Sequence, residues 1–140
     1  MNGRFFLDTN VFVYSFDRSA AAKARRAAQL IRQAVATRKG IVSYQVVQEF
    51  FNVALRRFAQ PMTAAEGEQY LGVVFRPLLA VHSFHALYGE AIRLSAKFSL
   101  SWYDSLIVVA AMESQCEILY SEDLQHGQRF GDLRVENPFL

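Results

Sequence analysis

The chain has 140 residues, of which 52% are apolar, and a formal net charge of +2. This length and apolar content suit one hydrophobic core, so a single domain over residues 1–140 is expected. The single cysteine, Cys116, excludes an intrachain disulfide, and the longest apolar run, Leu106–Met112, is far shorter than the roughly 20 residues that span a bilayer. Because Asp8 interrupts the start of the chain before any signal-peptide core, a cytoplasmic protein is predicted.

The first third of the chain predicts two strands separated by helix. Arg4–Leu7 is a short apolar run closed by Asp8, as expected for a buried strand that ends in a polar turn, and a helical turn follows over Val11–Phe16. Good helix formers with an apolar stripe predict a long amphipathic helix over Ala20–Thr37. A second buried strand is expected at Ile41–Val42.

The next helix is predicted over Tyr44–Ala59. Ser43 stands where its side chain can accept a hydrogen bond from the first free amides of this helix. Helical spacing places one polar stripe along it, made of Gln45, Glu49, Asn52 and Arg56. Glu49 is therefore expected near the helix start, on a polar face.

A further helix is expected to begin at a capping box formed by Thr63 and Glu66. It is predicted to reach about Val74 and to be stopped by Pro77. The third strand is then expected at Leu78–Val81.

The last part of the chain predicts two more helices and two strands. Phe84–Phe98 has amphipathic spacing, and Ser101 opens a helix whose body, Leu106–Met112, is apolar on every side and must be deeply buried. Ile118–Tyr120 is predicted to be the fourth strand, and Leu133–Val135 a fifth at the edge of the sheet.

Strands separated by helical stretches predict parallel pairing with right-handed crossovers. The expected fold is therefore α/β, a three-layer α/β/α sandwich with a mainly parallel sheet of four to five strands. The carboxyl ends of such strands open into one crevice, where ligands bind. Asp8 and Asp123 directly follow predicted strands, while Glu49 and Asp104 lie in the first two turns of helices that begin at the same edge. The four acids are expected to converge there.

Convergent acids predict a cation site. Each acid alone has a structural explanation, as a helix cap, a capping-box member or a solvated residue, but their joint placement favours a common site. Two carboxylates about 4 Å apart repel by about 4 kcal/mol at an effective dielectric near 20, and a bound cation relieves this repulsion. Oxygen donors alone suit Mg²⁺ or Mn²⁺. The histidines lack the spacing of paired zinc ligands; they are His82, His85 and His126.

Four ordered segments resemble those of PIN-domain nucleases and, within them, VapC-like toxins of type II toxin–antitoxin systems. They are Phe6–Asn10, Val46–Asn52, Trp102–Ile107 and Tyr120–Leu124. Together they extend over nearly the whole chain. The resemblance implies a PIN-like fold and a Mg²⁺- or Mn²⁺-dependent endoribonuclease that needs no organic cofactor.

The resemblance also implies roles for individual residues and for partners. The catalytic and metal-binding acids would be Asp8, Glu49, Asp104 and Asp123. Asn10 would hold the turn or a substrate phosphate, and Ser121 would bind a site water or orient Asp123, although either can be a structural cap. Members of the family act on RNA, are usually homodimers, and are inhibited by a cognate antitoxin protein whose tail enters the acidic groove.

On this hypothesis a metal-activated water hydrolyses an RNA phosphodiester bond. Basic side chains within Lys23–Lys39, together with Arg56 and Arg57, are candidates to contact the RNA backbone. The alternative explanation for this basic segment is a solvated helix face.

Two other functions stay open at this point. A phosphatase or phosphotransferase with Asp8 as covalent nucleophile would also place an aspartate after the first strand, but Asn10 stands where a second acid is expected, and no lysine follows a later strand. A non-catalytic PIN-like module could bind RNA or a protein without cutting, yet RNA binding alone would not favour four clustered negative charges.

Overall fold

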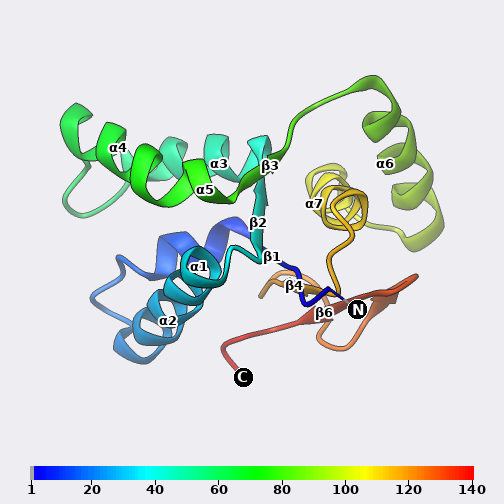
Figure 1. Cartoon of the computed structure of the whole chain (residues 1–140), viewed down its shortest axis with the longest axis horizontal. Helices are drawn as coiled ribbons and strands as arrows, with labels where there is room; N and C mark the ends of the chain where they lie inside the picture. Colours follow the sequence, from blue (N-terminus) through cyan, green and yellow to red (C-terminus); the bar gives the residue numbers. More distant parts are fainter. Residues whose placement is uncertain (1) are drawn as a thin grey trace.

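The computed structural model describes residues 2–140 and contains one six-stranded sheet covered by helices (Figure 1). The strands lie in the order β3–β2–β1–β4–β6–β5. They are β1 (Phe5–Leu7), β2 (Gly40–Ser43), β3 (Leu79–Val81), β4 (Ile118–Tyr120), β5 (Arg129–Phe130) and β6 (Leu133–Glu136). Neighbouring strands are parallel, except that β5 and β6 pair antiparallel. The predicted α/β class with a mainly parallel sheet is confirmed, with six strands rather than four or five.

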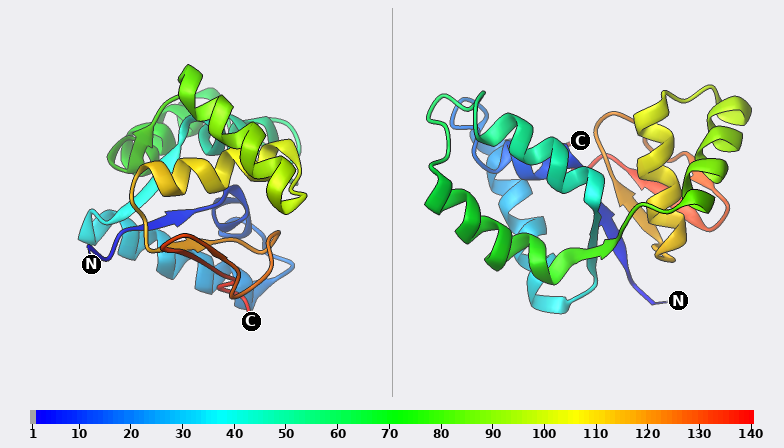
Figure 2. Two further views of the ribbon diagram at one scale, coloured as in Figure 1. Left: turned by 90° about the vertical axis from the view of Figure 1, so that its right-hand side faces the viewer. Right: turned by 90° about the horizontal axis from the view of Figure 1, so that it is seen from above.

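Helices alternate with the strands and lie on both sides of the sheet. They are α1 (Thr9–Tyr14), α2 (Ala21–Thr37), α3 (Tyr44–Ala54), α4 (Ala64–Tyr70), the π-helical turn η1 (Leu71–Phe75), α5 (Arg76–Leu78), α6 (His85–Phe98) and α7 (Trp102–Glu113). Figure 2 shows α7 and α2 on opposite sides of β1. Among residues 2–140, none of these helices combines the length and apolar character needed to cross a membrane.

Helix α3 ends at Ala54, five residues before the predicted end. The amides of Arg57 and Phe58 both donate to the carbonyl oxygen of Val53, at 2.7 and 3.2 Å, so the chain closes a tight turn instead of continuing the helix. The predicted cap at Ser43 is also wrong in detail. Ser43 is the residue before α3, but its side chain makes no capping hydrogen bond.

Pro77 does not stop the helix that starts with the Thr63–Glu66 capping box. The capping box is present, and α4, η1 and α5 follow one another without a break as far as Leu78. Pro77 lies one residue before the end of this continuous helix, where its missing N–H removes a single backbone donor.

The carboxyl-terminal strands differ from the predicted arrangement. β6 was expected at the sheet edge, but it pairs parallel with β4 on one side and antiparallel with β5 on the other. The edge strand is β5, whose two residues, Arg129 and Phe130, are too few to give a strand pattern in the sequence.

An aromatic cluster centred on Phe50 fixes α3 against α1 and the α4–η1 segment. Phe50 is fully buried. The centroid of its ring lies between 5.0 and 6.5 Å from those of six other rings, Phe12, Phe16, Phe51, Phe58, Tyr70 and Phe75. Because Phe50 is so extensively packed, the neighbouring Glu49 is held at a defined position on α3.

Parallel pairing of β1 and β4 brings the ends of these strands together. Leu7 is paired with Tyr120, and the amide of Asp8 donates to the carbonyl oxygen of Tyr120 at 3.1 Å. The residues that follow the two strands, Asp8 and Ser121, are therefore adjacent in space at the carboxyl edge of the sheet.

Candidate active site

A cavity of about 310 Å³ opens at the carboxyl edge of the sheet. All four predicted acids line it, namely Asp8 after β1, Glu49 on α3, Asp104 on α7 and Asp123 after β4. The fold thus brings together residues from four separate segments, as the strand polarity predicted. None of the side chains that line this cavity is a histidine or a cysteine.

Asp8 is the most buried of the four acids, with 5% of its surface exposed. Its Oδ1 accepts a hydrogen bond from the amide of Thr9 at 2.7 Å, and its Oδ2 accepts one from the hydroxyl of Ser121 at 2.8 Å. Burial nevertheless raises the pKa of Asp8 to about 7, and the negative charges of Asp123 and Glu49 add to this rise. The ionised form of Asp8 is therefore stabilised poorly by the protein alone.

Ser121 connects two of the acids. It is fully buried, donates to Asp8, and accepts a hydrogen bond from the amide of Asp123 at 3.2 Å. Ser121, which was expected to bind a site water or to orient Asp123, thus contacts the backbone of Asp123 and also bonds directly to Asp8, a contact that the sequence did not indicate.

Glu49 is held by a residue that the sequence did not single out. The hydroxyl of Thr9 donates to Oε1 of Glu49 at 2.7 Å, while the amide of Thr9 donates to Asp8. One residue at the start of α1 therefore positions two acids from different elements. Its place beside Asp8 in the sequence was the only available signal.

Asp123 accepts a hydrogen bond at Oδ2 from the side-chain amide of Asn10, at 3.0 Å. Burial raises the pKa of Asp123, and the charges of Asp104 and Glu122 raise it further. Asn10 was expected to hold the turn or a phosphate; its observed contact is with an acid of the cavity.

Asp104 lies in the first turn of α7, where its amide donates to the hydroxyl of the N-cap residue Ser101 at 3.2 Å. Its carboxylate is the only one of the four that accepts no hydrogen bond from residues 2–140. Helix α7 is tied to α3 next to this acid, because Nε2 of Gln45 donates to the carbonyl oxygen of Tyr103 at 3.2 Å.

Gln45 and Asn52 also line the cavity. Both belong to the predicted polar stripe that includes Glu49, so helical spacing had placed them correctly on this face. Gln45 is 4% exposed, and its Oε1 is buried without a hydrogen-bond partner in residues 2–140. A buried acceptor without a partner is costly, and this one stands in a cavity lined by acids.

The loop that carries Asp123 is held from α2. Nζ of Lys23 lies 2.7 Å from Oε1 of Glu122 and 4.6 Å from the centre of the Tyr14 ring. The hydrogen bond from Lys23 lowers the pKa of Glu122. Lys23, the first basic residue of the segment expected to contact RNA, is therefore engaged in a contact within the protein.

The donor set of the cavity suits a hard divalent cation. It offers carboxylate and amide oxygens. Burial, with a smaller contribution from neighbouring carboxylates, raises the pKa of Asp8 and of Asp123, and a cation beside them would favour their charged forms. The carboxylates of the four acids line one cavity but do not all point to its centre. The carboxylate of Glu49 accepts a hydrogen bond from Thr9, and that of Asp123 accepts one from Asn10. Within residues 2–140, no three acidic, histidine or cysteine side chains are already gathered closely enough to ligate one ion.

Three solved structures resemble the chain over nearly its whole length. A toxin–antitoxin complex from Klebsiella pneumoniae has a TM-score of 0.68 at 16% identity, covering 95% of this chain and 96% of that chain. VapC20 from Mycobacterium tuberculosis, described as a sarcin–ricin loop cleaving toxin, has a TM-score of 0.64 at 16% identity and covers 93% and 98%. DNA-bound VapBC from Salmonella typhimurium has a TM-score of 0.63 at 16% identity and covers 95% and 96%.

The chain has no match among curated proteins. At the sequence level, however, the PIN domain family matches residues 5–129, which include all four acids of the cavity. The sheet order, the similarity to VapC structures and this match agree with one another. The protein therefore belongs to the PIN domain family.

Proposed function

We propose that the protein is a metal-dependent endoribonuclease that hydrolyses RNA phosphodiester bonds. The observation that carries this proposal is the convergence of four acids, from four separate segments, on one cavity in which burial raises the pKa of Asp8 to about 7. Membership of the PIN domain family supports it. Such an arrangement is unfavourable for folding, which is typical of a site built for chemistry.

The cation would be Mg²⁺ or Mn²⁺, held by Asp8 and Asp104 with Glu49 and Asp123 completing the site. When bound, such an ion lowers the pKa of a water ligand and stabilises negative charge on phosphoryl oxygens. The raised pKa of Asp8 fits this role, because a nearby cation favours its charged form.

The protein's own residues hold these groups in place. Ser121 and Thr9 fix the two oxygens of Asp8, while Asn10 and Thr9 fix Asp123 and Glu49. Asp104 accepts no hydrogen bond from residues 2–140, so one oxygen of its carboxylate would be available to the cation and the other to orient the attacking water.

The alternative of a covalent aspartyl phosphate on Asp8 has less support. A phosphatase of this kind needs a second acid close after its nucleophile, and Asn10 stands in that position, where it donates a hydrogen bond to Asp123. Hydrolysis by a water in the cavity is the simpler use of these four acids.

We also propose that the protein is the toxin of a toxin–antitoxin pair and acts in the cytoplasm. Two of the similar structures are described as complexes, one as toxin–antitoxin and one as VapBC. A cognate antitoxin would occupy the acidic cavity and block it.

A homodimer is proposed on the basis of an exposed aromatic surface. Tyr88 of α6 and Trp102 of α7 stack with ring centroids 6.2 Å apart and are 37% and 39% exposed. The hydroxyls of Tyr88 and Tyr44 lie 3.2 Å apart, so three helices contribute. Sedimentation of the wild type and of Trp102→Ser tests this surface: the variant is expected to shift toward monomer.

The proposed activity is tested by incubating the purified protein with labelled mixed-sequence RNA and, separately, with single-stranded DNA of the same sequences. Each is treated with Mg²⁺, Mn²⁺ or EDTA. Cleavage of RNA that needs a metal ion is expected, with defined cut sites. Intact RNA under every condition, or cleavage that survives EDTA, would contradict the proposal.

A further inference from the structure

A second hollow lies next to the acidic cavity. It has a volume of about 670 Å³ and shares two wall residues, Val13 of α1 and Val53 of α3, with the acidic cavity. Its size falls within the roughly 300–1,000 Å³ of sites that bind small ligands. A molecule bound at the acids can therefore extend into this hollow without leaving the protein surface.

The second hollow carries more positive than negative charge. Arg18 and Arg57 both line it, one from the loop after α1 and the other from the turn after α3. Neither forms a salt bridge with any acid in residues 2–140. Asp17 also lines the hollow, but its Oδ1 accepts hydrogen bonds from the amide and the hydroxyl of Ser19, so it is not paired with either arginine.

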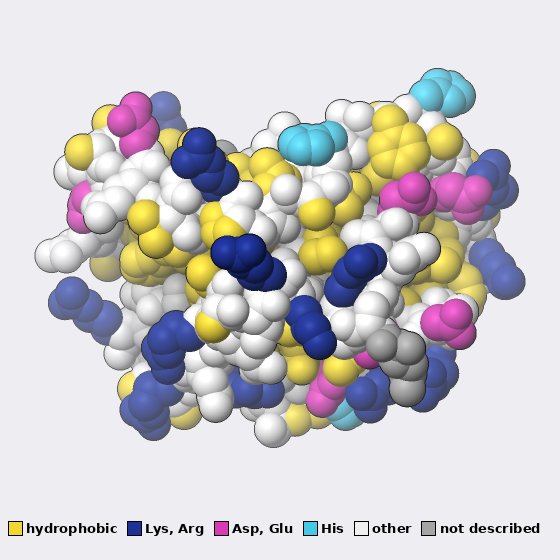
Figure 3. Space-filling view, in the orientation of Figure 1, with side chains coloured by type: hydrophobic (Ala, Val, Ile, Leu, Met, Phe, Trp, Pro, Cys, Tyr) yellow, Lys and Arg dark blue, Asp and Glu magenta, His cyan; other side chains and the backbone are white. Residues whose placement is uncertain are grey.

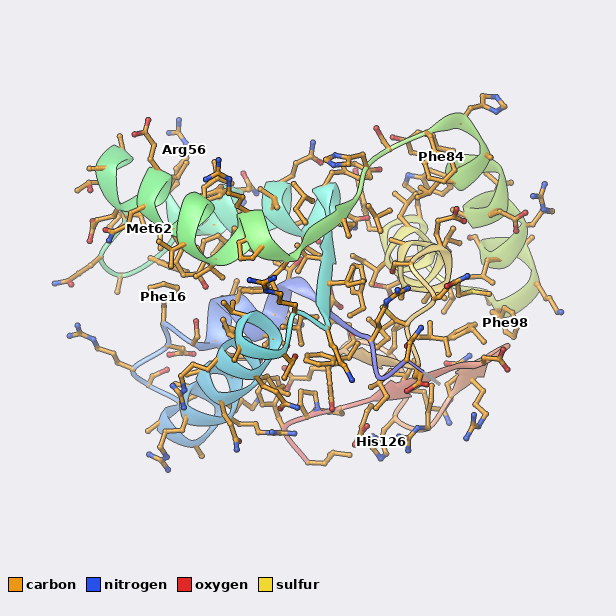
Figure 4. The ribbon with its side chains drawn as sticks, in the orientation of Figure 1. Phe16, Arg56, Met62, Phe84, Phe98 and His126 are labelled. Carbon is orange, nitrogen blue, oxygen red and sulfur yellow. The ribbon has the colours of Figure 1, made fainter. Side chains whose placement is uncertain are left out.

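The hollow also presents a fixed aromatic ring. Phe16 is 41% exposed, although its ring packs 5.3 Å from Phe58 and 5.4 Å from Tyr70, measured between centroids. In Figure 4, Phe16 lies on the side of α1 that faces α4. An aromatic ring held by packing on one side and exposed on the other is suited to stacking on an unpaired base.

The basic residues of Lys23–Lys39, most of them on α2, were expected to contact RNA together with Arg56 and Arg57. Figure 3 shows several lysine and arginine side chains over α2 at the lower left, without acidic ones among them. Two of its basic residues are nevertheless engaged within the protein: Lys23 with Glu122, and Arg26 with the carbonyl oxygen of Pro138 at 3.2 Å. None of its residues lines either hollow. Among the described side chains that line the two adjoining hollows, Arg18 and Arg57 of the second hollow are the only cations.

We propose that the second hollow is a nucleotide-binding subsite for single-stranded RNA, next to the bond that is cut. Arg57 and Arg18 bind phosphate oxygens, and Phe16 stacks on the base. This inference rests on the proposed endoribonuclease function. It is carried by charge complementarity: phosphates attract the two unpaired arginines, whereas the acidic cavity alone would repel the RNA backbone.

The test measures binding of a short fluorescent single-stranded RNA of mixed sequence to the full-length protein in EDTA, with RNA integrity checked on a gel. Arg57→Gln and Arg18→Gln are compared with Arg129→Gln, which removes the same charge from an exposed position on β5, outside both hollows and outside the basic segment of α2. Arg57→Gln and Arg18→Gln are each expected to weaken binding several-fold. Each should also reduce the slope of log affinity against log salt by about 0.7 per lost phosphate contact.

Affinities and salt slopes equal to those of Arg129→Gln would overturn the inference and assign the hollow to another occupant, such as a protein segment. Metal-dependent cleavage of the same RNA by the wild type is measured in parallel. If the wild type cuts RNA while Arg57→Gln and Arg18→Gln bind RNA like the control, the subsite proposal is wrong and the nuclease proposal is supported. If the wild type neither binds nor cuts RNA, the nuclease proposal fails and the subsite fails with it.

Discussion

The hydroxyl of Ser121 donates a 2.8 Å hydrogen bond to Oδ2 of Asp8, although the two residues are 113 positions apart in the sequence. Both directly follow strands that pair in parallel, so the sheet itself makes this contact. The bond lowers the pKa of Asp8, but burial outweighs it and raises the pKa to about 7. The site is therefore ordered, and yet the ionised form of Asp8 is unfavourable in it.

The burial of Asp8 predicts that the metal-free protein loses stability as the pH rises. Its pKa is about 7 in the folded protein and 3.8 ordinarily, so between these values the folded state binds more protons than the unfolded state. At 1.36 kcal/mol per pKa unit, the loss amounts to about 4 kcal/mol and is complete above the folded-state pKa.

Thermal unfolding of Asp8→Asn in EDTA across this pH range tests that prediction. The variant cannot ionise at this position, so above pH 7 it should be more stable than the wild type, and its stability should fall less between the two pKa values. Asp132→Asn, which alters an exposed acid, serves as the control and should follow the wild type. Parallel pH profiles for the wild type and Asp8→Asn would refute the claim that burial of Asp8 is costly.

Added Mn²⁺ or Mg²⁺ is predicted to stabilise the wild type at a pH above 7. A ligand that binds only the folded state raises the free energy of unfolding by about 2.7 kcal/mol at a concentration 100-fold above its dissociation constant. The increase should shrink at acidic pH, because protons compete for the carboxylates. It should also be largely lost in Asp8→Asn. Differential scanning calorimetry with and without the ion measures the effect, and an unchanged wild-type unfolding temperature would argue against a cation site.

Ser121→Ala is predicted to impair activity beyond its effect on stability. It removes the donor to Asp8 and the acceptor for the amide of Asp123, and changes of this kind around a metal site typically reduce metal affinity or activity about 10–100-fold. Ser114→Ala is the matched control, since it removes a hydroxyl that bonds to the carbonyl oxygen of Ala110 at the end of α7. The test measures initial cleavage rates at a temperature where all the proteins are folded. Equal rates for the two variants would mean that Ser121 has no role in the activity.

Gly40 and Gly72 are predicted to respond oppositely to alanine. A Cβ at Gly40 would lie 2.1 Å from Cβ of Ala34, so Gly40→Ala forces β2 away from α2 and should destabilise the protein by about 1–3 kcal/mol. Gly72 is in a helical turn with open space around it, and Gly72→Ala should stabilise by about 0.5–1 kcal/mol. Urea unfolding of both variants measures these changes. A neutral Gly40→Ala would mean that β2 and α2 are not as closely packed as described.

The sequence patterns predicted the helices and strands around the site more accurately than those far from it. The strands before Asp8 and Asp123 are apolar runs closed by polar turns, and the body of α7 is apolar on every side, so their burial was predictable. Met112 is the exception, because it was predicted to be buried with this body and is 40% exposed near the end of the helix. The end of α3 was not, because a turn closed by several amides on the carbonyl of Val53 has no side-chain signature. The strand β5 was missed because two residues are too few to show a period.

Within the site, the strand polarity predicted that the four acids share one cavity, and the structure places them there. The hydrogen-bond partners of the acids were harder to predict. Which side chain Thr9 or Asn10 contacts depends on how α1 is rotated against α3 and the loop after β4, and no local pattern encodes that rotation. Gln45 was placed on the correct face, but its unpaired buried Oε1 follows only from the packing of α3 against α7.

The central claim is that the shared acidic cavity is the catalytic centre. The most direct test compares the rates at which Asp104→Asn and Glu113→Gln cleave RNA in Mg²⁺ or Mn²⁺. Both variants remove one negative charge from α7, the first at its cavity end and the second at its exposed far end. The account predicts that Asp104→Asn abolishes metal-dependent cleavage while remaining folded, and that Glu113→Gln cleaves at the wild-type rate. Wild-type cleavage by a folded Asp104→Asn would contradict it.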